Sequence, residues 1–545
     1  MLTVLREFVL VREEQATAEQ PGTPTAMSTR NSRGLPLPEI DDPRFGFAPS
    51  SKPRTIRRTW LETFDWRLFR AGLTLELRAD RGTAELILTG RDGQPVATEA
   101  AGPASSAASD GGIRWPSRID ALPAGPLRER LASVVGVRAL VPVTRAVSVL
   151  TELRAVNEDE KTIAMLAVDQ MSVPRTLQRG AQPSSRLSVL PLRGYQSQAA
   201  KLADALERTP GVSRPVTSPF EAALATAGRR PGDYTGKIDV QLAGTMPAAL
   251  ALTIVLGRLF DTIEANLDGT ISDIDTEFLH DLRVAVRRTR SVLKTAKAVL
   301  PDSLLTRYRA EFKLLGDLTT PTRDLDVYLL GYPSMARTLV AATHEDLEPL
   351  RQYLVRQRAV AFRQLAKGLR SARFKSLASN WRSDLEQVAA GRGKRPRVAA
   401  FAARKIARAH EQVLVAGSAI NHASPPQALH DLRKLCKELR YLLEVFASLH
   451  DPADQWRAVS ELKALQDCLG EFQDTDIQLI ELRAFAERMM ADHSAPARTL
   501  LAMGEIAADL ATRQASSRGE FAGRFADFAS ARGQARIAAL TREAA

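Results

Sequence analysis

The sequence predicts an α+β protein of more than one domain, in which an antiparallel β part precedes a duplicated, all-helical part. Up to about residue 227, short segments alternate apolar and polar residues, as half-buried strands do. From about Val240 onward, stretches rich in Ala, Leu, Arg, Lys and Glu have helical spacing and are separated by short Pro or Gly breaks. One motif of the helical part recurs 150 residues later, which indicates two related halves.

The β part contains several segments with period-two alternation. A turn at Asp80–Gly82 separates the first two candidate strands, and Asn157–Glu160 separates another pair. A helix with Leu202 and Leu206 on one side follows the last strand. The predicted strands are Leu73–Arg78, Ala84–Thr89, Val147–Arg154, Thr162–Val168 and Arg186–Arg193, and the predicted helix is Gln196–Glu207.

Composition suggests four segments along the chain. Residues 1–55 are expected to be mostly flexible, although Phe8–Val11 could add a strand and Met27 is a possible alternative start. Two further stretches, Gly102–Pro116 and Pro174–Ser185, have the low complexity of mobile loops. The predicted domains are a β domain at 56–227, a linker at 228–239, and a helical domain at 240–535 with repeats at about 240–390 and 400–535.

Charge predicts an anionic partner. The 545 residues include 75 Lys and Arg against 63 Asp and Glu, a formal net charge of +12. Aromatic residues are only 6%, which argues against base stacking as the main mode of binding. Cys436 and Cys468 form no metal or disulfide pattern, so we expect buried thiols in a reducing cytoplasm. We expect no signal peptide, and no apolar run is long enough to predict a membrane span.

The repeated motif carries basic residues at fixed spacing. The first copy runs from Leu279 to Arg290 and the second from Leu429 to Arg440. His280, Arg283, Arg287 and Arg290 of the first copy recur as His430, Arg433, Lys437 and Arg440. Downstream, Glu311 and Lys313 recur as Glu461 and Lys463, and Gly316 is answered by a glycine at 470. Asp324 and Asp326 recur as Asp474 and Asp476.

Helix geometry places these basic residues on one face. Positions i, i+3, i+7, i+10 and i+14 share a side of a helix. His280, Arg283, Arg287, Arg290 and Lys294 therefore form a stripe, with Lys297 at its edge, and the run from 280 to 297 is roughly 25 Å long. Like charges at this spacing destabilise a helix, and few acidic residues on the same helix offset them. A binding role explains this better than a solvated face does.

The aspartate pairs and the histidines could each have another role. The Asp324/Asp326 and Asp474/Asp476 pairs could neutralise the stripes in part, and we expect them to orient the arginines. Neither His280 nor His430 has a partner at metal-ligand spacing, so we predict no metal site and no cofactor. A histidine that donates a hydrogen bond to a phosphate oxygen fits better.

The motif resembles the CHAD family, the conserved histidine α-helical domain, over roughly residues 240–535. The resemblance implies two helical bundles related by a pseudo-twofold axis, whose basic helices line a cleft for inorganic polyphosphate. Carried over by position, it implies as ligands His280, Arg283, Arg287, Arg288, Arg290, His430, Arg433, Lys434, Lys437 and Arg440, with Lys294, Lys313 and Lys463 as additions.

The segment from Thr63 to Arg78 resembles the CYTH family, which implies an antiparallel β tunnel for triphosphates over about residues 56–210. Arg145, Arg154 and Asp169 fall where further tunnel residues are expected. The family's chemistry requires an ExExK motif and late-strand glutamates, and neither occurs here. We therefore expect a degenerate domain without triphosphatase activity, in which Arg78, Arg91, Arg145 and Arg154 keep a basic wall that binds phosphate weakly.

The leading hypothesis is therefore non-catalytic binding of inorganic polyphosphate, or of another polyanion, in a basic cleft. Such a protein could gather at polyphosphate granules in the cytoplasm and would need no membrane. One alternative is a nucleic-acid-binding protein, although Tyr441 is the only aromatic residue beside the stripes. A second alternative is a metal-dependent triphosphatase or polyphosphatase that uses the N-terminal domain.

Overall fold

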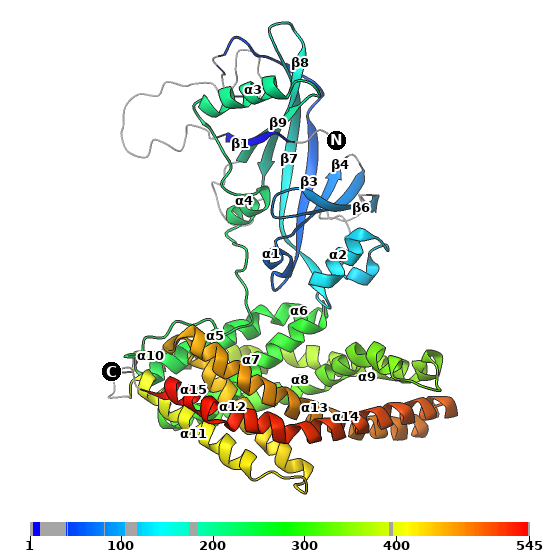
Figure 1. Cartoon of the computed structure of the whole chain (residues 1–545), viewed down its shortest axis with the longest axis vertical. Coiled ribbons are helices and arrows are strands. Elements are labelled where there is room, and N and C mark those ends of the chain that lie inside the picture. Colours follow the sequence, from blue (N-terminus) through cyan, green and yellow to red (C-terminus); the bar gives the residue numbers. More distant parts are fainter. Residues whose placement is uncertain are drawn as a thin grey trace. The chain divides into compact units, whose positions relative to one another are not determined.

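The computed structural model describes residues 4–10, 37, 40, 42–80, 82–103, 117–173, 184–391 and 396–542. Most of the loops Gly102–Pro116 and Pro174–Ser185 and the alternative start Met27 lie outside these residues. The chain divides into two compact units, Met1–Tyr234 and Thr235–Ala545, so the division falls inside the segment expected to be a linker (Figure 1). We call them the β unit and the helical unit. In neither unit is a described helix both long enough and apolar enough to span a membrane.

The β unit is built on one antiparallel sheet. Its described strands follow the order β10-β1-β9-β8-β7-β3-β4-β5-β6, and β2 pairs with β7 beside this path. The strands are β1 (Arg6–Leu10), β2 (Gly46–Pro49), β3 (Arg54–Thr63), β4 (Thr74–Asp80), β5 (Thr83–Thr89), β6 (Pro95–Pro103), β7 (Leu140–Val156), β8 (Thr162–Ser172), β9 (Ser184–Pro191) and β10 (Val212–Ser213). The helices are α1 (Arg67–Arg70), α2 (Pro126–Val135), α3 (Gln196–Arg208) and α4 (Pro219–Thr226).

Helices cover the apolar face of this sheet. Leu202 and Leu206 of α3 pack on Leu187 and Val189 of β9, and all four side chains are fully buried. A second cluster joins α2 to β4 and β5. Because successive strand residues point to opposite faces, the alternate residues of the central strands point to the other face, where charged side chains lie.

The described part of the N-terminal segment adds two short strands to the sheet. A strand was expected as a possibility at Phe8–Val11, and β1 lies at Arg6–Leu10, where it pairs with both β9 and β10, while β2 pairs with β7. Phe8 of β1 is fully buried in the cluster with α3. Burial of this side chain holds the short strand against α3.

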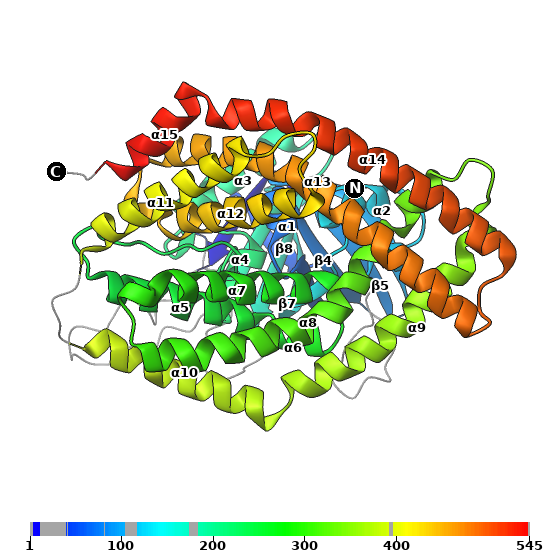
Figure 2. The same cartoon turned by 90° about the horizontal axis from the view of Figure 1, so that it is seen from below.

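The helical unit repeats its elements at a constant spacing. The first half contains α5 (Ala248–Ala265), α6 (Leu267–Ile271), α7 (Thr276–Thr295), α8 (Asp302–Arg337), α9 (His344–Leu369) and α10 (Ala372–Ala390). The second contains α11 (Val398–Ser418), α12 (Pro426–Val445), α13 (Pro452–Ala491), α14 (Ala497–Ala529) and α15 (Ala531–Thr541). Helices α11, α12 and α13 each begin 150 residues after α5, α7 and α8. Figure 2 shows the two halves side by side, green and yellow to red.

One apolar core joins the two halves. It runs from α5, α7 and α8 into α11, α12 and α13, with Trp381 of α10 fully buried against Tyr308 and Phe312. A smaller cluster holds the far ends of α8, α9, α13 and α14 together. The two helical halves that the resemblance implied are present, and they share this core. The two thiols, Cys436 and Cys468, are free and buried in it, as predicted.

Candidate functional site

Helices α7 and α12 lie side by side in the middle of the helical unit and run in opposite directions (Figure 2). Two ion pairs join them, Arg288 to Glu444 at 2.7 Å and Lys294 to Glu438 at 2.6 Å. Between these pairs, Ser291 and Val292 of α7 face Tyr441 and Leu442 of α12 across a narrow apolar seam. Ser291 and Tyr441 hold matching places in the two repeats, so a pseudo-twofold axis passes close to them.

The sequence fixes how the basic stripe of α7 points. The Asp275 carboxylate caps the helix by accepting from the backbone N–H groups of Glu277 (2.9 Å) and Phe278 (3.2 Å). Leu282, Val286 and Leu293 are fully buried in the core. The stripe at 280, 283, 287 and 290 therefore lies off the core, toward α8 and α12.

The cations of the first repeat meet neutral partners on α8. Arg283 donates from Nη1 to the carbonyl of Gly316 (3.2 Å) and to the hydroxyls of Thr319 (3.2 Å) and Thr320 (2.5 Å). Arg290 also lies against Gly316, where an added Cβ would stand 3.0 Å from its Nη1. The glycine thus lets two guanidinium groups approach one turn of α8.

Cations from both repeats lie near one another at Arg287 and Lys437. Burial, and then the charges of Arg433 and Arg287, lower the pKa of Lys437 to about 8. Lys437 therefore lies within electrostatic reach of cations from both repeats. Among the described residues, neither Arg287, Arg290 nor Lys437 has a hydrogen-bond or ion-pair partner. We call Arg283, Arg287, Arg290 and Lys437 the open cluster.

In the second repeat, the matching cations meet carboxylates. Arg433 pairs with Asp474 at 3.0 Å, and Lys434 with Asp431 at 3.0 Å. Arg440 donates from Nε to Glu444 at 2.7 Å and from Nη1 to Gln466 at 3.3 Å. Glu444 therefore bridges Arg440 of its own helix and Arg288 of α7.

The two histidines occupy matching places with different neighbours. His430 Nδ1 is hydrogen-bonded to the side chain of Gln473 on α13. His280 faces Arg323 of α8, which holds the position that Gln473 holds in the second repeat. Burial and the charge of Arg323 lower the pKa of His280, which favours its neutral form. Arg323 was not among the predicted ligands, although it belongs to the repeated downstream motif.

The remaining predicted ligands lie at the edge of the site. Arg288 is held by the Gly236 carbonyl (2.9 Å) as well as by Glu444, and its side chain is only 14% exposed. Lys313 pairs with Asp317 at 2.8 Å, and the charges of Arg290 and Arg283 also act on that carboxylate. Lys463 takes the matching, exposed place on α13. Arg288 therefore serves first as a structural link between α7 and α12.

The aspartate pairs do less than predicted to orient the stripes. Asp474 binds Arg433, and Asp324 acts on the charge of Arg283. Asp326 instead binds Arg358 of α9 at 2.6 Å, and Asp476 accepts from Gln514 of α14 at 2.9 Å. Only the first aspartate of each pair therefore interacts with an arginine of a stripe.

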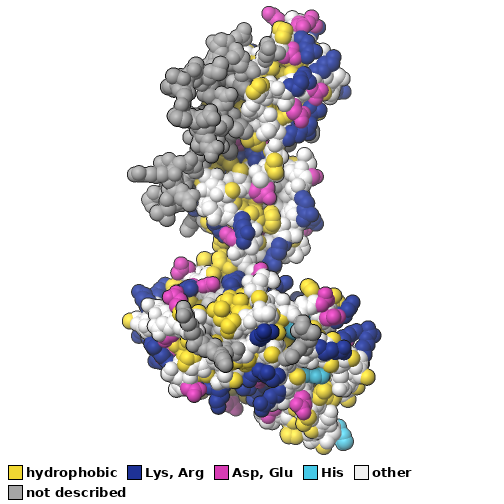
Figure 3. Space-filling model, turned by 90° about the vertical axis from the view of Figure 1, so that its left-hand side faces the viewer, with side chains coloured by type: hydrophobic (Ala, Val, Ile, Leu, Met, Phe, Trp, Pro, Cys, Tyr) yellow, Lys and Arg dark blue, Asp and Glu magenta, His cyan; other side chains and the backbone are white. Residues whose placement is uncertain are grey.

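On the charged face of the β unit, basic and acidic side chains pair with one another. Arg58, only 7% exposed, donates to both oxygens of Glu76 (2.7 and 2.9 Å) and pairs with Asp169 at 3.1 Å. Arg78 also pairs with Glu76, and Arg54 pairs with Asp80 and Glu152. Burial alone would raise the pKa of Glu76, but Arg58 and Arg78 outweigh it and lower the pKa to about 2. On the surface drawn in Figure 3, acidic and basic side chains likewise alternate over this unit.

The predicted basic wall of this unit does not form. Of its four members, only Arg78 enters the buried network, and its guanidinium is taken by Glu76. Arg145 is exposed and pairs in register with Thr59, so it lies on the opposite face from Arg58. Arg91 lies in the turn after β5, and Arg154 is exposed near the end of β7. Within the described ranges, no three His, Cys, Asp or Glu side chains are grouped to hold a metal ion.

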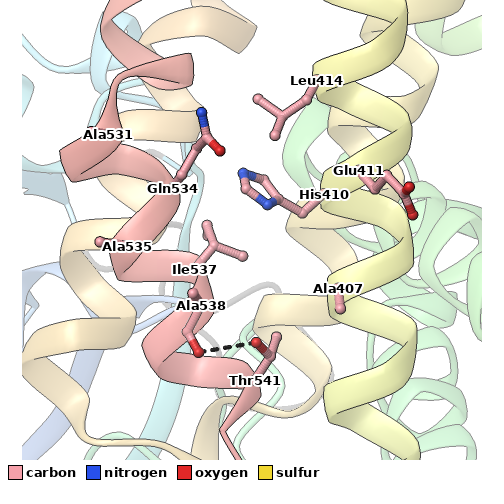
Figure 4. A pocket seen from close by; sticks show the side chains of 10 residues that line it. All are labelled: Ala407, His410, Glu411, Leu414, Ala531, Gln534, Ala535, Ile537, Ala538 and Thr541. Atoms are coloured by element: carbon pink, nitrogen blue, oxygen red, sulfur yellow. Dashed lines mark hydrogen bonds between the residues drawn. The ribbon is translucent and has the colours of Figure 1, made fainter.

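A pocket of about 630 Å³ between α11 and α15 lies apart from the open cluster. Figure 4 shows His410 and Leu414 of α11 pointing toward Gln534 and Ile537 of α15. Burial lowers the pKa of His410. None of the residues lining the pocket is Lys or Arg, so it does not suit a polyanion.

Comparison with known proteins agrees with the sequence on the helical unit. The family model of the CHAD domain matches residues 254–483, so the prediction for this part is confirmed. A solved CHAD domain from the plant Ricinus communis is 25% identical, with a TM-score of 0.46, over 54% of this chain and 96% of its own. PptA from Streptomyces chartreusis is 17% identical, with a TM-score of 0.41, over 51% of this chain and 99% of its own.

A Hippeastrum protein described as a candidate adenylyl cyclase with a dominant triphosphatase activity is also similar. It is 14% identical, with a TM-score of 0.22, over 34% of this chain and 89% of its own. No curated protein sequence matches the chain.

Proposed function

We propose that this chain, which carries a CHAD domain over residues 254–483, binds inorganic polyphosphate through the cations of α7 and α12. The observation that carries the proposal is the open cluster. Its four cations come from both repeats, and none of them forms an ion pair with a described carboxylate. Arg283 and Lys437 are partly buried, whereas Arg287 and Arg290 are exposed. A multivalent anion would relieve their mutual repulsion, which nearby carboxylates such as Asp324 and Asp474 offset only in part.

Arginine suits this ligand because its planar guanidinium can bind two phosphate oxygens at once. Arg283, Arg287 and Arg290 span roughly 10 Å along α7 at 1.5 Å per residue, so a chain of phosphates can meet them in succession. A polyphosphate carries no bases and needs only such spaced cations.

Nucleic acid is a weaker candidate. The one aromatic side chain beside the stripes, Tyr441, is half-buried in the seam between α7 and α12, among Leu442, Val445 and Phe446. It is therefore poorly placed to stack on a base. The β unit offers no better site for a phosphate, because its buried arginines already bind the protein's own carboxylates. We expect no phosphate release from triphosphate or polyphosphate with Mg²⁺ or Mn²⁺.

The test is a titration of the full chain with long-chain polyphosphate and with RNA of equal phosphate content, at several salt concentrations. We expect tighter binding of polyphosphate, and affinity that falls linearly with the logarithm of salt. A variant with Arg283, Arg287, Arg433 and Lys437 changed to Glu should lose at least about 100-fold in affinity with unchanged helix content.

A matched control carries the same change of charge elsewhere. It replaces Arg404, Arg408, Lys367 and Lys375 by Glu, all exposed on α9, α10 and α11. Similar losses in both variants would mean that net charge, and not this site, binds the polyanion. Equal affinity for RNA and polyphosphate would overturn the preference for polyphosphate.

A further inference from the structure

The two repeats match in backbone but not in charge. Where α7 has Arg288 and Lys294, α12 has Glu438 and Glu444. Where α8 has Arg323 beside His280, α13 has Gln473 beside His430. The first repeat is therefore more basic around its stripe, although both stripes hold the same three cationic positions.

The matched cations also differ in their partners, and again the surroundings of the first repeat are the less acidic. Arg283 donates only to a carbonyl and two hydroxyls, whereas its counterpart Arg433 pairs with Asp474 at 3.0 Å. Arg290 has no polar partner among the described residues, whereas its counterpart Arg440 pairs with Glu444 at 2.7 Å. An anion that binds Arg433 or Arg440 must break an ion pair. One that binds Arg283 or Arg290 need not, although Asp324 and Asp317 act on these arginines over a longer distance.

Lys437 resembles the cations of the first repeat, because it too lacks an ion-pair partner among the described residues. It lies on α12, but it lacks a carboxylate partner among the described residues and is within electrostatic reach of Arg287. The open cluster therefore consists of three arginines of α7 and one lysine that comes from the other repeat.

We propose that the open cluster is the primary phosphate subsite and that Arg433 and Arg440 form a secondary one, reached only by longer chains. This inference rests on the proposed function and deepens it. A short oligophosphate should occupy Arg283, Arg287, Arg290 and Lys437. A longer chain should extend across the pseudo-twofold axis and displace Asp474 and Glu444 from their arginines.

The duplication supplies matched variants for the test. Arg290→Gln and Arg440→Gln remove equivalent side chains, and the full chain is titrated with tripolyphosphate and with long-chain polyphosphate. For tripolyphosphate we expect a loss of at least about 10-fold for Arg290→Gln, which equals about 1.4 kcal/mol, and less than about 3-fold for Arg440→Gln. For the long chain, the loss in Arg440→Gln should grow.

A third variant should gain affinity. Asp474→Asn frees Arg433, and the Asp474 side chain is 60% exposed, so the fold should tolerate the change. We expect tighter binding of the long chain by about 2- to 5-fold, and no change for tripolyphosphate. Circular dichroism and thermal unfolding of each variant show whether it is folded.

The outcomes separate the two proposals. Equal losses for Arg290→Gln and Arg440→Gln with tripolyphosphate would overturn the unequal subsites and leave polyphosphate binding intact. A gain for Asp474→Asn with tripolyphosphate would likewise place the short ligand on the second repeat. If the wild-type chain bound neither ligand at low salt, both proposals would fail.

Discussion

Replacing Lys437 by Met should stabilise the helical unit while weakening polyanion binding. In the folded chain this ammonium is half-buried, lies near Arg433 and Arg287, and has a pKa of about 8 in place of 10.5. At about 1.36 kcal/mol per pKa unit, the difference corresponds to about 3.4 kcal/mol of unfavourable charge. Solvent screens a side chain that is partly exposed, so we expect a gain of about 1–2 kcal/mol.

The stability gained by Lys437→Met should depend on pH. Because the pKa is lower in the folded chain, the unfolded chain holds this proton more tightly. The cost is present in full below about pH 8 and disappears as the pH rises toward 10.5. Lys437→Met should therefore be more stable than wild type at pH 7, and the difference should shrink by pH 10.

The assay is urea unfolding at pH 7 and pH 10, followed by helical circular dichroism without ligand. Lys463→Met is the control, because that lysine is exposed on α13 and its loss should change stability by less than about 0.5 kcal/mol. An unchanged or lower stability of Lys437→Met at pH 7 would refute the reasoning, as would a gain that persists undiminished at pH 10. Added polyphosphate should stabilise wild type more than the variant.

Three further predictions concern Lys437, the Arg58–Glu76 ion pair and the contact of Gly417 with Phe525. Polyphosphate affinity should fall as the pH rises from about 8 toward 10, because the anion favours protonated Lys437, and titration of Lys437→Met should lack most of this fall. Arg58→Leu should destabilise the β unit by about 3–5 kcal/mol in denaturant unfolding, because Glu76 loses its main partner, whereas exposed Arg57→Leu should have little effect. Gly417→Ala should destabilise the helical unit by about 1–3 kcal/mol, because its Cβ would overlap the Phe525 ring, whereas Gly504→Ala meets nothing and should be neutral or slightly stabilising in the same measurement.

The sequence was most informative where one face of an element is apolar. The hairpin of β4 and β5, the strands β7 to β9 and helix α3 lie close to their predicted positions, because their buried residues keep a regular period. Strand β3 was missed because its inward-facing positions include Arg54, Arg58 and Glu62, which resemble a charged loop. Not every proline of the helical part is a break, because Pro321 and Pro333 lie inside α8, where packing overrides their low helix propensity.

The candidate site was predictable only in part, because the sequence pattern does not show contacts between helices. Helical spacing placed the cations of α7 and α12 on one face of each helix, but it could not show which of them would meet a carboxylate. Glu438 and Glu444 reach Lys294 and Arg288 from a helix 150 residues away in sequence. Arg323 was overlooked because its neighbour His280 lies on another helix. Such pairings depend on the tertiary structure, which periodicity does not contain.

The antiparallel contact of α7 with α12 has an evolutionary consequence. Near Ser291 and Tyr441, positions that match in the two repeats face each other across this contact. Two identical halves would therefore set like charge against like charge at the positions of Arg288 and Lys294. The opposite signs now found there favour association of unlike halves, so a chain rebuilt from two copies of its first half should lose this attraction and join its halves poorly.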